Sequence, residues 1–101
     1  MQQPAWLTAA WAEFGVREVA GSGDAARVVR YFRDAGHVQI TNDETPWCAA
    51  FVGAMLERSD LTGSGSLLAR SYLKWGIAID EPKLGAIAVL TRGSDPGAGH
   101  V

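Results

Sequence analysis

Apolar side chains recur every three or four residues along the first part of this sequence, as they do on one face of a helix. This spacing predicts helices over residues 4–14, 24–35 and 46–58. A glycine directly follows each of the first two stretches, which suits the left-handed residue that often ends a helix. The apolar stripes comprise Leu7, Ala10, Trp11 and Phe14 in the first, Ala25, Val28, Val29 and Phe32 in the second, and Cys48, Phe51, Val52 and Met55 in the third.

The pattern changes in the last third of the chain. A connection rich in glycine and serine precedes a short predicted helix over residues 67–75. Residues 85–90 predict a strand, and a loop rich in glycine and proline at 93–99 leads to a second strand that begins with His100. We find no internal repeat, low-complexity tract or linker, so we expect one domain over residues 1–101.

The composition of the chain argues against several classes of function. The chain has 101 residues, of which 48% are hydrophobic and 20% charged, as is typical of a small globular domain. Its net charge of −2 gives no electrostatic reason to expect binding to nucleic acid or an anionic membrane. One cysteine and two distant histidines provide neither an intrachain disulfide nor the spacing of metal ligands. No apolar run approaches the ~20 residues of a membrane span. We expect a monomer without cofactor, metal, nucleic acid or membrane insertion.

The only cysteine stands at the predicted start of the third helix. Thr45 can serve as the N-cap of this helix, and Pro46 suits its first position. Cys48 then falls at about the third helical position, where free backbone N–H groups and the positive end of the helix dipole favour a thiolate. The alternative is a structural thiol, because free cysteines are often buried and Cys48 shares its stripe with Phe51 and Met55.

A thiolate nucleophile needs a base, and the chain has two histidines. His100 opens the last predicted strand, and a histidine there can take the thiol proton and hold the resulting ion pair. His37 follows the end of the second predicted helix, where a solvent-facing histidine needs no function. We therefore predict that Cys48 and His100 form a catalytic pair.

Five segments carry a resemblance to a known family. They are WL at 6–7, TPWCAAFV at 45–52, ARSYLKWG at 69–76, PKLGAIAV at 82–89 and GHV at 99–101. In sequence and order they resemble the phage- and prophage-associated branch of the NlpC/CHAP superfamily of cell-wall cysteine hydrolases. The resemblance extends over nearly the whole chain.

The resemblance implies a fold and an activity. The fold is α+β and papain-like, with N-terminal helices packed on an antiparallel sheet. The activity is cleavage of amide bonds of the peptidoglycan stem peptide, by an endopeptidase or an amidase, with Cys48 as nucleophile and His100 as base. The backbone N–H of Cys48 would contribute to the oxyanion hole. The resemblance also suggests that Glu44, Trp47, Arg70 and Ser71 bind substrate.

The family sheet usually has five or more strands, whereas this sequence supplies one or two and no third catalytic residue. We therefore expect a fragment of a longer protein, inactive by itself. A non-catalytic wall-binding or phage-assembly module of the same fold is the alternative. The N-terminus lacks the basic-then-apolar pattern of a signal peptide. We expect cytoplasmic synthesis with phage- or holin-type delivery to the cell wall, or association with a virion.

Overall fold

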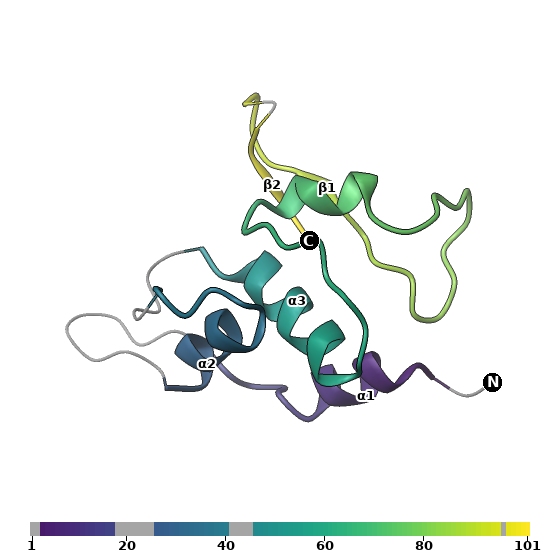
Figure 1. Cartoon of the computed structure of the whole chain (residues 1–101). Coiled ribbons are helices and arrows are strands. Elements are labelled where there is room, and N and C mark those ends of the chain that lie inside the picture. The colour runs from purple at the N-terminus through teal and green to yellow at the C-terminus, as the bar shows by residue number, and fades with distance from the viewer. Residues whose placement is uncertain (1–2, 18–25, 41–45, 96) are drawn as a thin grey trace.

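The computed structural model describes residues 3–17, 26–40, 46–95 and 97–101. Within these ranges, three α-helices come first, followed by a 3-10 helix and a two-stranded sheet (Figure 1). The elements are α1 (Ala5–Trp11), α2 (Ala26–Asp34), α3 (Cys48–Arg58), η1 (Ala69–Lys74), β1 (Leu90–Thr91) and β2 (Gly99–His100). None of the helices in the described ranges is long and apolar enough to cross a bilayer.

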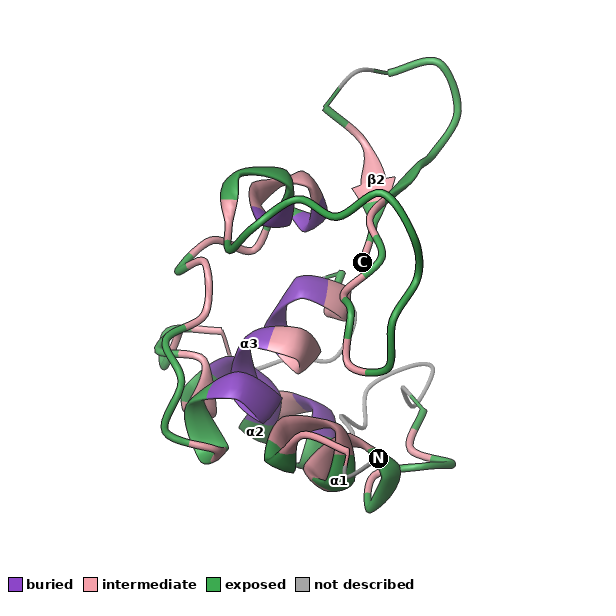
Figure 2. Cartoon of the chain, turned by 90° about the vertical axis from the view of Figure 1, so that its right-hand side faces the viewer, coloured by how far each residue is buried: buried purple, intermediate pink, exposed green. Residues whose placement is uncertain are grey.

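The main core lies between α2 and α3, with α1 packed against the same cluster. Figure 2 shows most of the buried parts of the described chain on α2 and α3. Small residues of α3 allow the close approach of its neighbours, because there is little side chain between the backbones. The buried cluster consists of Val28, Tyr31, Phe32, Ala50, Ala54 and Met55.

A second cluster covers the other side of α3. Ala49 and Leu56 of α3 are buried there with Tyr72 of η1. Ile87, Val89 and other partly buried apolar residues of the C-terminal region pack around them. Helix α3 therefore lies between two layers, which explains why its buried residues are not confined to one stripe.

The connection from α3 to η1 passes close to α3 itself. A Cβ atom on Gly63 would lie 3.2 Å from the Cα atom of Gly53 and 3.0 Å from the hydroxyl oxygen of Tyr72. The backbone N–H of Ser64 donates to the same hydroxyl at 3.3 Å. Two glycines thus let the chain cross α3 and bring η1 over it.

An ion-pair network joins the ends of the three α-helices. The guanidinium of Arg58 contacts Glu13 at 3.3 Å and Asp34 at 2.8 Å. Arg27 also pairs with Glu13. The Arg58 guanidinium lies 5.5 Å from the centre of the Tyr31 ring. The network holds α1, α2 and α3 together at their exposed edge.

The helix predictions were right in position and wrong in several details. Helix α1 ends at Trp11 rather than residue 14, and it turns Trp6, Ala9 and Ala10 toward the core. Trp11 and Phe14, predicted on the buried stripe, are 61% and 84% exposed. The predicted helix over 67–75 is a 3-10 helix. The predicted start of the second helix, at 24–25, lies outside the described residues.

The predicted strand over 85–90 was wrong over most of its length. Strand β1 comprises Leu90 and Thr91, which pair antiparallel with His100 and Gly99 respectively. Residues 85–90 do alternate between half-buried and exposed positions, as a strand does. Within the described chain no neighbouring strand pairs with 85–89, so the period-two pattern is present without a ladder.

Candidate active site

Cys48 is the first residue of α3. The prediction that it stands third was wrong, because Trp47 has φ −121° and ψ 9° and is the residue that precedes the helix. The carbonyl oxygen of Trp47 accepts the first helical hydrogen bond, from Phe51 at 2.8 Å. Thr45, the predicted N-cap, lies outside the described residues. Cys48 still lies in the first turn, where backbone N–H groups lack helical partners and the helix dipole is positive.

The ring of Trp47 fixes how the chain enters α3. It stacks on Tyr31 of α2 with ring centroids 5.8 Å apart. Phe51, one turn into α3, meets the same Tyr31 ring edge-on at 5.0 Å. Since Tyr31 is fully buried, the start of α3 is anchored on the main core.

His100 reaches the start of α3 from the other end of the chain. It lies on β2, and Figures 1 and 2 both show the C-terminal end close to the beginning of α3. The neighbouring Val101 packs against the cluster that contains Ala49, the residue after Cys48. This packing holds the last residues of the chain beside the helix start.

Cys48 and His100 line the same pocket, which has a volume of about 520 Å³. Cys48 is half-buried and His100 is exposed. The other residues that line the pocket are Pro46, Trp47, Phe51, Arg92 and Val101. The pocket therefore combines a thiol at a helix start, an imidazole and a largely apolar wall.

Arg92 is a pocket residue that the sequence did not reveal. Its Nη2 atom lies 3.5 Å from Nδ1 of His100. Arg92 follows β1 directly, and Leu90 is paired with His100, so Arg92 is two residues along the same face of the strand pair. Pairing the two predicted strands in this register would have found it.

Arg70 lies behind the strand that carries His100. Its Nε donates a hydrogen bond of 2.6 Å to the carbonyl oxygen of Ala98. A Cβ atom on Gly99 would lie 2.9 Å from Cγ of Arg70 and 2.9 Å from the carbonyl oxygen of Leu90. Arg70 does not line the pocket, and its described contacts attach η1 to β2 rather than extend into the space beside Cys48.

The other predicted substrate residues are placed differently. Ser71 does not line the pocket, and its hydroxyl bonds to the hydroxyl of Ser64 at 2.6 Å in the connection before η1. Trp47 does line it. Glu44 lies outside the described residues. His37 follows α2 and does not line the pocket; its backbone N–H donates to the carbonyl oxygen of Phe32 at 2.7 Å.

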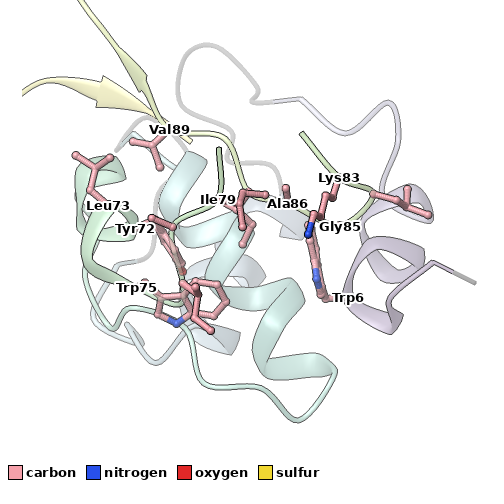
Figure 3. Close-up of a pocket in the computed structure, with 13 residues that line it drawn as sticks. Trp6, Tyr72, Leu73, Trp75, Ile79, Lys83, Gly85, Ala86 and Val89 are labelled. Carbon is pink, nitrogen blue, oxygen red and sulfur yellow. The ribbon is translucent and has the colours of Figure 1, made fainter. Parts of the chain in front are cut away.

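A second pocket, of about 470 Å³, lies between Trp6, η1 and the segment 77–89 (Figure 3). Trp75 and Tyr72 form part of its wall, but their polar atoms are occupied elsewhere. The indole N–H of Trp75 donates to the carbonyl oxygen of Thr62 at 2.9 Å. The first pocket is the one that holds both the thiol and the imidazole, and it is therefore the candidate site for chemistry.

Comparison with known proteins adds no assignment. No protein-family model, no curated protein and no solved structure matches the chain. Among the described residues, no group of three or more His, Cys, Asp or Glu side chains is arranged to hold a metal ion. The chemistry is argued from the pocket residues themselves.

Proposed function

We propose that this protein is a peptidoglycan hydrolase of the NlpC/CHAP type, which cleaves an amide bond of the cell-wall stem peptide with Cys48 and His100. The observation that carries the proposal is that these two residues, far apart in the sequence, line one pocket. The ordered motifs of the sequence support the choice of family and its papain-like fold.

The mechanism follows from the groups in the pocket. His100 accepts the proton of the Cys48 thiol, and the thiolate attacks the carbonyl carbon of the amide. The negative charge that develops on the carbonyl oxygen is stabilised by the backbone N–H of Cys48 at the helix start. The imidazolium of His100 then protonates the leaving amine, and a thioester remains on Cys48. Water attacks the thioester, with His100 as the base, and frees the acid product and the thiol.

The test is the release of soluble fragments from purified cell wall by the full-length protein. Cys48→Ser and His100→Ala should each lower the rate on the order of a thousandfold or more, and the double variant should be no worse, because the two residues act as one unit. His37→Ala is the matched control and should retain wild-type activity. The thermal midpoints of the variants should stay close to that of the wild type.

Mass spectrometry of the released fragments separates the two possible bonds. An endopeptidase leaves cut stem peptides, whereas an amidase leaves intact peptides freed from the sugar. Activity that survives Cys48→Ser contradicts the mechanism. Binding to cell wall without any release of fragments would instead favour the non-catalytic module.

A further inference from the structure

Arg92 is the only permanently charged side chain among the described residues that line the pocket of Cys48 and His100. It is exposed, and no carboxylate pairs with it within the described parts of the chain, where the ion-paired arginines are Arg27, Arg33 and Arg58. A guanidinium offers five N–H donors in a planar fork. One nitrogen lies 3.5 Å from Nδ1 of His100, and one such contact does not use all five donors of the fork.

The wall around Arg92 strengthens its effect on a bound anion. Trp47, Phe51 and Val101 give the pocket a largely apolar lining. A ligand that fills the pocket displaces water from this lining, and charges attract each other more strongly where water is displaced. The planar fork of arginine matches a carboxylate and can bind both of its oxygens.

We propose that Arg92 determines specificity by binding a carboxylate of the substrate next to the amide bond that Cys48 attacks. The preferred substrate is therefore an acidic peptide, with a free carboxylate on one side of the scissile bond. This inference rests on the proposed function for its substrate, but the anion site itself can be tested without any hydrolysis.

The first test compares two reagents that alkylate the Cys48 thiol. Iodoacetate carries a carboxylate and iodoacetamide is its neutral counterpart. The rate with iodoacetate divided by the rate with iodoacetamide therefore measures the attraction of an anion to the pocket. The ratio at Cys48, followed by mass spectrometry and divided by the ratio for N-acetylcysteine, should be about fivefold higher in the wild type than in Arg92→Gln. It should fall with added salt, because the attraction is screened.

Two variants control this measurement. Arg30→Gln changes the net charge equally from an exposed site on α2, away from the pocket, and should keep the wild-type ratio. Arg92→Lys keeps the charge but not the fork, and should give an intermediate ratio. An unchanged ratio in Arg92→Gln, with an unchanged thermal midpoint, overturns the inference.

The second test uses matched peptides with a carboxylate or a carboxamide beside the scissile amide. In the full-length protein, the wild type should hydrolyse the carboxylate peptide with a KM about fivefold lower, and Arg92→Gln should lose that preference. An equal loss on both peptides would assign Arg92 to positioning His100 and overturn the inference. A shifted alkylation ratio without hydrolysis of either peptide would support the anion site and contradict the proposed hydrolase.

Discussion

The two residues of the proposed catalytic pair belong to regions that are held in very different ways. Cys48 begins α3, which together with α2 carries the largest fully buried side chains of the described structure: Tyr31, Phe32, Met55, Leu56 and Val28. His100 lies on a two-residue strand in a region where Ile77 is 91% exposed and Leu73 is 64% exposed. Half-buried Cys48 is anchored through the helix that it begins, whereas His100 is attached to that helix from outside the main core.

The attachment consists of few contacts. Strand β2 pairs with β1 over two residues, Arg70 bonds to Ala98, and Val101 packs beside Ala49. Regions with few buried contacts open locally at a low cost in free energy, whereas a packed core opens only with global unfolding. We therefore expect substitutions in the core to change mainly stability, and substitutions near His100 to change mainly activity.

The largest expected effect comes from the core. Phe32→Ala should lower the free energy of unfolding by about 3–5 kcal/mol, since it removes a fully buried aromatic ring and leaves a cavity. Urea denaturation followed by far-UV circular dichroism measures this. Phe14→Ala, at a position 84% exposed, is the control and should stay within about 0.5 kcal/mol of the wild type. Similar losses in both variants would contradict the assignment of the core.

A smaller stability effect with a clear loss of activity is expected from Gly99→Ala. The new methyl group would meet the Leu90 carbonyl oxygen and Cγ of Arg70, each at 2.9 Å, so β2 must shift. A displacement of a catalytic group by about 1 Å can cost up to roughly a hundredfold in rate, and we expect a loss of at least about tenfold in the full-length protein. The thermal midpoint should change by only a few degrees or less, because the shift is confined to the hairpin.

Gly97→Ala provides the comparison within the same hairpin. A Cβ atom there would lie 3.4 Å from an Asp95 oxygen, an ordinary contact, and activity should be close to that of the wild type. Equal activity of the Gly99→Ala and Gly97→Ala variants would show that the packing of β2 against Arg70 does not position His100.

The smallest expected effect is a pH-dependent change in stability that arises from Tyr31 in the main core. The hydroxyl of Tyr31 is buried and has no hydrogen-bond partner among the described residues. Burial raises the pKa of this phenol above its ordinary value of 10.0, although Arg27 and Arg58 oppose the shift. Above pH 10 the unfolded chain therefore releases the Tyr31 proton more readily than the folded chain, and stability falls as pH rises.

Tyr31→Phe removes both the unpartnered hydroxyl and this ionisation. At pH 7 its free energy of unfolding should equal that of the wild type or exceed it by up to about 1 kcal/mol. Between pH 9 and pH 11 the variant should lose less stability than the wild type, as measured by urea denaturation at each pH. A loss of more than about 1 kcal/mol at pH 7 would mean that the hydroxyl makes a stabilising bond.

Sequence periodicity predicted the main core between α2 and α3 better than the region of β1 and β2. Val28, Phe32 and Met55 were expected on apolar stripes, and all three are fully buried. Helical spacing is a local property, so it can be recognised without knowing the neighbours. The stripe of α3 was incomplete because a second layer covers its other side, and that layer is formed by distant residues such as Tyr72.

The candidate site was predicted only as far as its motifs extend. Cys48 and His100 were both identified, and they line one pocket, although their catalytic roles stay a prediction. Arg92 was missed because its position depends on the register between β1 and β2. The link from Arg70 to Ala98 joins η1 to the hairpin, and no local pattern in the sequence reveals such a contact.

The stacking of Trp47 on Tyr31 has a consequence for spectroscopy. The indole of Trp47 lies against the core on one side and lines the pocket on the other. A ligand that enters the pocket changes the polarity around this indole, so its fluorescence emission should shift when the site is occupied. Trp6, Trp11 and Trp75 do not line this pocket, and a Trp47→Phe variant supplies the background to subtract. The protein thereby carries its own fluorescent reporter of occupancy beside Cys48, with no dye attached to the thiol.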